Sequence, residues 1–269
     1  MTLLDAAILG LVEGVTEYLP VSSTGHLILT ARLLGIGGPG EQLAAVKEAI
    51  DSFSIVIQGG AILAVAGLYR GRIRQMAAGL VATLRDGARL APEAREGVLL
   101  LRNLVLSFLP AAVIGVLLAP WIKRHLFHPW PVVAALAAGG VLLLAIGRWQ
   151  RRRQQGSSDP GDAAPDGPFE LSAAGALIIG FVQVLAMWPG TSRSMVTILA
   201  GMLVGLGPRR AAEYSFLLAL PTLGGATIYE LARAWNAGVA ASGSGLDGLE
   251  RLVADNGGWL PSLVGLVVA

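Results

Sequence analysis

Residues 13–26 read EGVTEYLPVSSTGH, and this polar run divides an apolar stretch that extends from Leu3 to Leu34. A membrane-spanning helix needs about 20 consecutive apolar residues, so the stretch is too broken for one span and too short for two. Pro20 lies in the middle of the run and ends a helix there. We therefore expect a re-entrant pair of helices, which enters the membrane, turns at the polar run and leaves on the same side.

A second stretch, from Leu171 to Leu206, has the same construction, with PGTSRS at residues 189–194 as its polar break. The two stretches align with each other. Residues 8–13 (ILGLVE) match residues 178–183 (IIGFVQ), and with one gap PVSST at 20–24 matches PGTSR at 189–193. This internal repeat is weak but ordered, and it predicts two similar re-entrant pairs.

The composition is that of an integral membrane protein. Of 269 residues, 54% are hydrophobic and only 14% are charged, whereas a soluble domain carries about 25% charged residues. No run alternates as the strands of a membrane barrel do. The absence of cysteine excludes disulfides and thiolate metal sites. Four further segments are apolar enough to span: Phe53–Tyr69, Val98–Ala119, Val132–Gly147 and Ala211–Leu231.

The positions of the arginines predict the topology. If the first pair opens to the outside, most lysines and arginines fall in cytoplasmic segments, as the positive-inside rule requires. The second pair then opens to the inside, so the two repeats have opposite orientations and their polar tips can meet. The predicted fold is an all-α polytopic membrane protein, an inverted-topology repeat with two re-entrant helix pairs. The arginines are explained by topology, so no nucleic-acid surface is expected.

We expect a single membrane domain over residues 1–269. Repeat one covers about 1–147, a cytoplasmic linker rich in Gly, Ser, Asp and Pro covers about 148–170, and repeat two covers about 171–269. The last apolar stretch, Trp259–Ala269, is too short to span. We therefore expect the C-terminal helix to be truncated.

The first polar run contains the residues of a phosphate and metal site. Glu13 and Glu17 are four residues apart and share one face of a helix. Two carboxylates that close repel each other unless a cation lies between them. A hard divalent cation, Mg²⁺ with Ca²⁺ as the alternative, suits oxygen ligands. After Pro20, a cap at Ser22, Ser23 or Thr24 would leave helix N–H groups exposed near Gly25 and His26.

The second polar run offers a matching anion site. Pro189 and Gly190 break the helix, Thr191 or Ser192 caps the next one, and Arg193 supplies a planar fork suited to phosphate. Two helix N-termini that meet at one point favour a bound anion. An ionisable group at bilayer depth costs about 2.5–3.5 kcal/mol, which favours a functional explanation.

Each of these residues also has a structural explanation. The glutamates could interact favourably with the helix dipole, and the hydroxyls could serve only as helix caps. His26 could be a hydrogen-bonded structural residue, and the side chain of Arg193 could extend to the membrane–water interface.

The two runs closely resemble the signature motifs of the bacterial undecaprenyl-diphosphate phosphatases, also called bacitracin-resistance proteins. SIVIQGGAILAV at residues 54–65 is similar to the stretch between those motifs, and the likeness extends from about Ala6 to Tyr229. The resemblance implies a multi-pass hydrolase of the bacterial cytoplasmic (inner) membrane. Such an enzyme removes the terminal phosphate of a C55 lipid diphosphate, recycles the carrier for peptidoglycan synthesis, and has an active site reached from the outer side.

Carried onto this chain, the resemblance implies roles for particular residues. Glu13 and Glu17 are the expected metal ligands, and Ser23 is the candidate nucleophile, with Glu17 or His26 as its base. Arg193 is expected to bind the diphosphate and to act in catalysis. The further substrate-binding residues are Ser22, Thr24, Gly25, Ser192 and Ser194. The chain departs from the family at Met195, which stands where the family usually has glycine, and we expect its side chain either to crowd the second tip or to change the backbone there.

The same features are compatible with a second function class. Inverted repeats with broken helices are also used by secondary transporters, so a flippase of a polyprenyl phosphate is the alternative. The cluster of two glutamates, a serine and a histidine favours the phosphatase, because a transporter does not need that many reactive groups to bind one anion. The expected partners are a polyprenyl diphosphate and the bilayer, and the sequence leaves a homodimer open.

Overall fold

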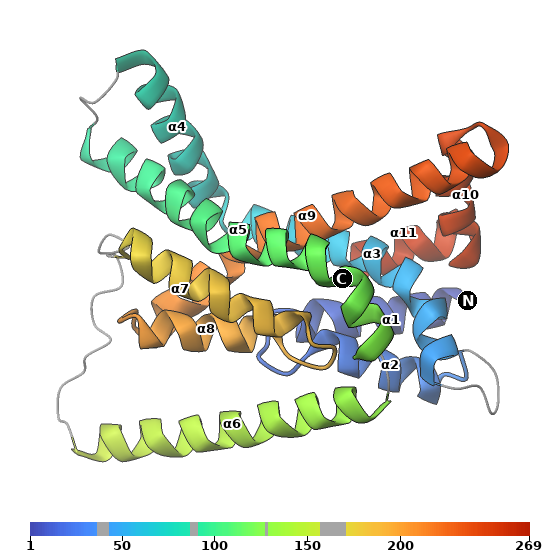
Figure 1. Ribbon diagram of the computed structural model, residues 1–269, viewed down its shortest axis with the longest axis horizontal. Coiled ribbons are helices and arrows are strands. Elements are labelled where there is room, and N and C mark those ends of the chain that lie inside the picture. The colour runs from blue at the N-terminus through green and yellow to red at the C-terminus, as the bar shows by residue number, and fades with distance from the viewer. Residues whose placement is uncertain (37–42, 87–90, 127–128, 157–170) are drawn as a thin grey trace.

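The computed structural model describes residues 1–36, 43–86, 91–126, 129–156 and 171–269. These ranges form helices joined by short turns and contain no strand (Figure 1). The first half contains α1 (Leu3–Thr16), α2 (Ser23–Leu33), α3 (Leu43–Leu68), α4 (Arg70–Asp86), α5 (Pro92–His125) and α6 (Pro129–Gly156). The second half contains α7 (Ala173–Gln183), the 3₁₀ helix η1 (Val184–Met187), α8 (Arg193–Leu203), α9 (Pro208–Ser242), α10 (Gly245–Asp255) and α11 (Trp259–Val268).

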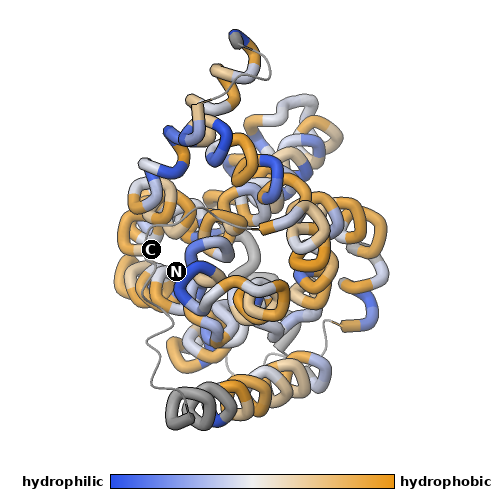
Figure 2. Tube along the Cα trace, turned by 90° about the vertical axis from the view of Figure 1, so that its left-hand side faces the viewer, coloured by the Kyte–Doolittle hydropathy of each residue, from blue (hydrophilic) through white to orange (hydrophobic). Residues whose placement is uncertain are grey.

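The predicted all-α polytopic fold is confirmed. Within the described residues, three helices are long and apolar enough to cross a membrane, in α5, α6 and α9. A fourth candidate is the pair α3–α4, which bends by 74° at Tyr69. These elements contain the four segments expected to span. Figure 2 shows apolar residues along most of the helices, with hydrophilic residues gathered on α4 and beside it.

Each polar run forms the turn of a helix hairpin. α1 packs against α2, and α7 packs against α8, as expected for the two re-entrant pairs. Figure 1 shows the two hairpins side by side, with their turns directed toward each other in the middle of the molecule. The hairpins have separate apolar cores. One is built around Leu9, Phe53 and Ile57, and the other around Tyr214 and Leu217.

The repeat extends beyond the hairpins. The series α1, α2, α3, α4, α5 is matched by α7, α8, α9, α10, α11, and α11 packs against α1 as α5 packs against α7. The aligned glycines make these contacts possible. A Cβ at Gly10 would lie 2.5 Å from the carbonyl oxygen of Gly265, and one at Gly180 would lie 2.6 Å from that of Ser107. Only glycine allows the helices to approach this closely.

α6 extends beyond its expected limits. It continues to Gly156, so the first residues of the predicted linker are helical, and residues 157–170 lie outside the described residues. Its spanning window is only 6% buried, and Figure 1 shows it apart from the rest of the bundle.

Candidate active site at the meeting point of the hairpins

The first tip is the turn between α1 and α2. α1 ends at Thr16, and Pro20 lies in the turn that follows. Ser22 precedes α2 with a φ of 68°, a left-handed conformation that residues other than glycine seldom adopt and that is often found at functional sites. Tyr18 fixes the tip to α3, because its hydroxyl donates a hydrogen bond to the carbonyl oxygen of Ala61 (2.7 Å).

The second tip, which is the turn between η1 and α8, contains similar residues in a different conformation. Gly190 has a φ of 92°, and a Cβ there would lie 2.6 Å from the carbonyl oxygen of Val132, so the position requires glycine. Ser192 caps α8, since its hydroxyl accepts a hydrogen bond from the backbone N–H of Met195 (3.2 Å). This is one of the two caps that the sequence allowed. Arg193 is the first residue of α8.

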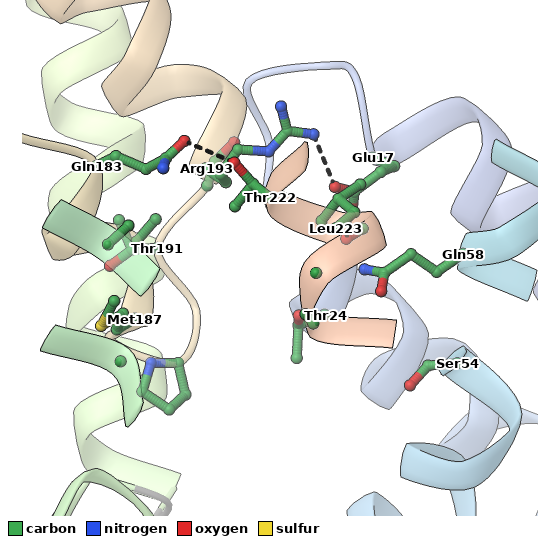
Figure 3. Close-up of a pocket in the computed structure, with 18 of the residues that line it drawn as sticks. Glu17, Thr24, Ser54, Gln58, Gln183, Met187, Thr191, Arg193, Thr222 and Leu223 are labelled. Atoms are coloured by element: carbon green, nitrogen blue, oxygen red, sulfur yellow. Dashed lines mark hydrogen bonds and ion pairs between the residues drawn. The ribbon is translucent and has the colours of Figure 1, made fainter. Parts of the chain in front are cut away.

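Arg193 joins the two tips. Its NH2 nitrogen donates to Oε1 of Glu17 (2.9 Å), and its NH1 nitrogen donates to the backbone carbonyl of Ser215 on α9 (2.9 Å) (Figure 3). Ser194 adds a second link, because its hydroxyl donates to the backbone carbonyl of Leu19 (2.7 Å). The repeats that the sequence aligned are thus in direct contact at their polar turns. The Arg193–Glu17 ion pair is almost completely shielded from solvent, where such pairs are strong only with good geometry.

Ser23 is placed against the same carboxylate. Its hydroxyl donates to Oε2 of Glu17 at 2.5 Å, a short hydrogen bond, so Glu17 contacts Ser23 with one oxygen and Arg193 with the other. His26 points elsewhere: its Nδ1 lies 2.8 Å from the backbone carbonyl of Ser22. A carbonyl can only accept, so this ring nitrogen carries the hydrogen. Of the two expected bases, Glu17 is the one in contact with Ser23.

The remaining residues expected to bind substrate divide into two groups. Ser22, Thr24 and Ser192 line the cavity at the tips, whereas Gly25 and Ser194 are not among the residues that line it. Gly25 lies against Leu136 of α6, and Ser194 is fully buried, with its hydroxyl on Leu19. Ser22 makes no capping bond with its side chain. The first N–H groups of α2 are therefore not satisfied by the residue that precedes the helix.

Glu13 has the features of a cation ligand. It is 1% exposed, lines the same cavity as Glu17, and its Oε2 has no hydrogen-bond partner among the described residues. A buried carboxylate oxygen without a donor is unstable unless a cation or a ligand proton satisfies it. Among the described residues no group of three or more His, Asp or Glu side chains could hold a metal. A cation held by two glutamates would therefore need water and substrate oxygens as further ligands, which suits Mg²⁺.

The cavity between the tips has a volume of about 670 Å³. One part of its wall is polar and contains Glu13, Glu17, Ser23 and Arg193. Another part is apolar and combines Leu27 and Ile28 of α2, Leu223 and Ala226 of α9, and one face of α5. That face consists of Phe108, Ala111, Ala112, Gly115 and Val116. The cavity can therefore receive a molecule with a charged end and a hydrocarbon end.

Several polar side chains of the cavity were not among the expected site residues, including Ser54, Gln58, Gln183 and Thr222, and also Thr191, Tyr229 and Glu230. Figure 3 shows Gln58 on the same side as Glu17, and Gln183 on the opposite side, next to Thr222. Gln183 could have been found from the sequence, because it aligns with Glu13 in the internal repeat. Ser54 and Gln58 could have been found as polar residues inside a predicted span.

Met195 does not crowd the second tip. Its side chain is 4% exposed and does not line the cavity. It extends to α6, where a Cβ at Gly139 would lie 3.3 Å from its terminal methyl carbon. The absence of a side chain at Gly139 leaves room for the methionine. The departure from the family pattern is thus accommodated by packing against α6.

Comparisons with known proteins agree with this geometry. The model of the family described as "Bacitracin resistance protein BacA" matches residues 6–269. The undecaprenyl-diphosphatase of Sorangium cellulosum (strain So ce56) is 45% identical over 229 residues, which cover 85% of this chain and 66% of that protein. The undecaprenyl-diphosphatase of Pseudomonas putida (strain GB-1) is 44% identical over 228 residues, which cover 85% of this chain and 72% of that protein.

Proposed function

Because this chain belongs to the bacitracin resistance protein BacA family, we propose that it is a membrane phosphatase. It converts undecaprenyl diphosphate to undecaprenyl phosphate and inorganic phosphate. The observation that carries the proposal is the contact of Ser23 and Arg193 with the two oxygens of Glu17. A nucleophile, its base and an anion-binding guanidinium then lie within one cavity. The reaction recycles the lipid carrier for cell-wall synthesis and accounts for the family's bacitracin resistance.

The lining of the cavity supports a separate position for each end of the substrate. The diphosphate lies at the polar wall, near Arg193 and the N-termini of α2 and α8, where helix dipoles and free N–H groups favour negative charge. The prenyl chain leaves along the apolar face of α5, between Phe108 and Val116. The cavity of about 670 Å³ holds only the first part of a C55 chain, so the rest extends into the bilayer.

Ser23 attacks the terminal phosphorus and Glu17 takes its proton. The bond from that phosphorus to the bridging oxygen breaks as the new Oγ–P bond forms, and undecaprenyl phosphate leaves with the bridging oxygen. Water then hydrolyses the phosphoserine and releases inorganic phosphate. Arg193 bonds to Glu17 before substrate binds. When its guanidinium turns to the phosphate oxygens, the carboxylate is left free to accept the proton of Ser23.

Glu13 and Glu17 would hold a divalent cation such as Mg²⁺, which when bound neutralises charge on the phosphate oxygens. The unpartnered oxygen of Glu13 supports this assignment. His26 acts as a positioning residue, because its hydrogen bond to the Ser22 carbonyl holds the left-handed turn that precedes Ser23.

A direct attack by water, with Ser23 as a binding group only, is the alternative chemical course. The two courses differ in their intermediate. Rapid quenching of the working enzyme, followed by mass spectrometry of the peptide that contains Ser23, should show a phosphorylated serine. An active enzyme that never shows this adduct would establish the attack by water.

The experiment that tests the function is phosphate release from undecaprenyl diphosphate by the purified protein in detergent. We expect release that stops on addition of a chelator, returns with Mg²⁺, and is lost in Glu17→Gln. The variant keeps the size of the side chain but removes its charge, and its melting temperature shows whether it is folded. A folded protein that binds prenyl phosphates without hydrolysing the diphosphate would favour the flippase, which the inverted repeat also suits.

The protein acts in the bacterial inner membrane, with its site open to the outer side. The distribution of arginines supports this orientation. α4 begins with Arg70, Arg72 and Arg74, and the positive-inside rule assigns such a segment to the cytoplasmic side. A substrate arriving in the outer leaflet can then enter the cavity without crossing the membrane.

A further inference from the structure

Gln183 is a buried polar side chain that the reaction described above does not use. It is the last residue of α7, is 2% exposed, and lines the cavity that contains Ser23 and Arg193. Its carbonyl oxygen lies 3.4 Å from the hydroxyl of Thr222 on α9, which donates its shorter hydrogen bond to the backbone carbonyl of Leu218 (2.7 Å), whereas the amide nitrogen of Gln183 has no partner among the described residues. Figure 3 shows this contact and the position of Gln183 across the cavity from Glu17. The amide therefore has two N–H groups to offer to a molecule in the cavity.

The internal repeat makes Gln183 the counterpart of Glu13. ILGLVE at residues 8–13 aligns with IIGFVQ at 178–183, and both final residues are almost fully buried and line the same cavity. Each has one side-chain atom without a partner, Oε2 in Glu13 and Nε2 in Gln183. The two positions differ in their chemistry, because a carboxylate oxygen accepts from a cation or a donor, whereas an amide nitrogen donates. The first repeat thus offers a ligand for positive charge and the second a ligand for negative charge.

An unpartnered buried amide needs an explanation. Burial of an N–H group without an acceptor is unfavourable, and an apolar side chain of similar size would avoid the loss. Arg193 shows the same feature, because two of its nitrogens are bonded to protein groups while Nε has no partner among the described residues. Both donors belong to one cavity. An anion with several oxygen atoms would satisfy both.

The position of Gln183 indicates which of the two phosphates of the substrate lies next to it. Gln183 belongs to α7, which packs against α5, and its side chain lies beside Thr222 of α9. Most of the apolar residues that line the cavity belong to these two helices, α5 and α9, so the prenyl chain lies along them. Glu17 and Ser23 belong to the other hairpin, and Figure 3 shows Gln183 and Met187 on one side of the cavity with Glu17 and Gln58 on the other. The phosphate next to the chain is therefore the one near Gln183, and the terminal phosphate is the one near Ser23.

We propose that Gln183 is a substrate-binding residue whose amide N–H groups donate hydrogen bonds to the phosphate that stays on the lipid. Thr222 is a positioning residue, because its hydroxyl, which is fixed by its bond to the Leu218 carbonyl, lies against the amide oxygen and so holds the amide group in place. The inference rests on the proposed phosphatase activity. It further implies that the product, a prenyl monophosphate, is held by the same contact.

The test is a comparison of Gln183→Met and Gln183→Glu in the detergent-solubilised protein, with undecaprenyl diphosphate as substrate and undecaprenyl phosphate as competitive inhibitor. Loss of one donor to a charged group should raise KM and the inhibition constant together, each by about tenfold in Gln183→Met, with kcat within about threefold. Gln183→Glu has nearly the same shape but places a carboxylate against the phosphate. Its KM should rise by a further tenfold or so.

Two further variants complete the design. Thr222→Val keeps the shape of its side chain and should raise KM by about threefold, since it removes only the group that holds the amide. Gln75→Met on α4 is the matched control, because Gln75 does not line the cavity, and its kinetics should equal those of the parent protein. Melting temperatures show that each variant is folded.

Particular results would overturn the inference. A KM and an inhibition constant that stay unchanged in Gln183→Met would exclude the contact, as would a Gln183→Glu variant no weaker than Gln183→Met. A fall in kcat alone would remove Gln183 from the retained phosphate. In each of these cases the parent protein still hydrolyses the diphosphate, so failure of the inference is distinct from failure of the proposed function, which would appear as an inactive parent.

Discussion

Glu17 has two tasks at the centre of the molecule. One oxygen holds the hydroxyl of Ser23 and the other holds Arg193. Because Arg193 comes from the second hairpin, the carboxylate proposed as the base for Ser23 also joins the two repeats. A phosphate that binds Arg193 would therefore remove the hydrogen bond that Arg193 donates to Glu17. Substrate binding and activation of Ser23 are coupled through this single side chain.

Substitution of Arg193 by lysine should lower kcat/KM by about 100-fold. The charge remains, but one ammonium group cannot bond to Glu17, the Ser215 carbonyl and a phosphate with the separate nitrogens that arginine provides. Steady-state phosphate release measures the effect, and an unchanged melting temperature shows that the tips still meet. A rate close to that of the parent protein would mean that charge alone is needed at this position.

Met195 offers a second prediction at the same scale. Met195→Ala should reduce the free energy of unfolding by about 2–3 kcal/mol, because it removes a buried side chain that fills the space beside Gly139. kcat/KM should stay within about threefold, since Met195 does not line the cavity.

Thermal unfolding in detergent and phosphate release together test the Met195 prediction. Met202→Ala on α8 is the control, because Met202 is partly buried against the apolar core rather than against α6. A variant of Met195 with normal stability and low activity would show that the methionine acts at the tip itself.

The sequence indicated the site well at the two polar runs and less well elsewhere. Glu17, Ser23 and Arg193 were expected together, and the structure brings them into contact. The sequence did not predict that Ser194 is buried and bonded to the Leu19 carbonyl. A serine that binds substrate and a serine that joins two turns cannot be distinguished by sequence. Gln183 could have been found from its alignment with Glu13, but nothing in the sequence pairs it with Thr222. Their meaning comes from helices that only the fold brings together.

At the level of helices, long apolar segments predicted the positions of helices reliably, whereas helices with many polar residues were not predicted. The four expected spans lie in α3, α5, α6 and α9. α4 and α10 were not expected, because their polar residues lower the hydropathy by which spans are found. Both are held by neighbouring helices, α4 by α5 and α10 by α9. Tertiary packing of this kind is not visible in a local window of sequence.

The contact of α7 with α5 should be sensitive to a single methyl group. In Gly180→Ala, the new Cβ would lie 2.6 Å from the carbonyl oxygen of Ser107, and backbone atoms cannot turn aside. α7 must therefore move, at a cost of about 1–3 kcal/mol. Because Gln183 lies three residues further along the helix, kcat/KM should fall as well.

The matched control for Gly180 is Gly140→Ala on α6, where a new Cβ would meet nothing within 4 Å. Alanine is a better helix residue than glycine by up to about 1 kcal/mol, so this variant should be as stable as the parent or slightly more stable. Melting temperatures in detergent measure both. Equal behaviour of the two variants would show that the close approach of α7 to α5 is not required.

For the whole molecule, the inverted repeat explains where the site lies. The turns of the two hairpins are in direct contact through Arg193 and Ser194, and the long helices α3 and α9 pack against each other beside them. Neither repeat has a complete site, because Glu17 and Ser23 come from one and Arg193 and Gln183 from the other. The same arrangement would allow one repeat to move against the other, which is why the phosphatase and the flippase share this architecture.

The orientation of the molecule in the membrane can be tested directly because the chain has no cysteine of its own. α5 has 34 residues and is about 50 Å long, more than the roughly 30 Å thickness of the hydrocarbon core, so its two ends lie on opposite sides. Arg74, on α4 at one end, and His125, the last residue of α5 at the other, are both exposed. We expect His125→Cys to react with an impermeant maleimide in intact cells and Arg74→Cys to react only after the membrane is opened. The reverse pattern would place the arginines outside and turn the entrance of the cavity toward the cytoplasm, where a phosphatase of the outer leaflet could not reach its substrate.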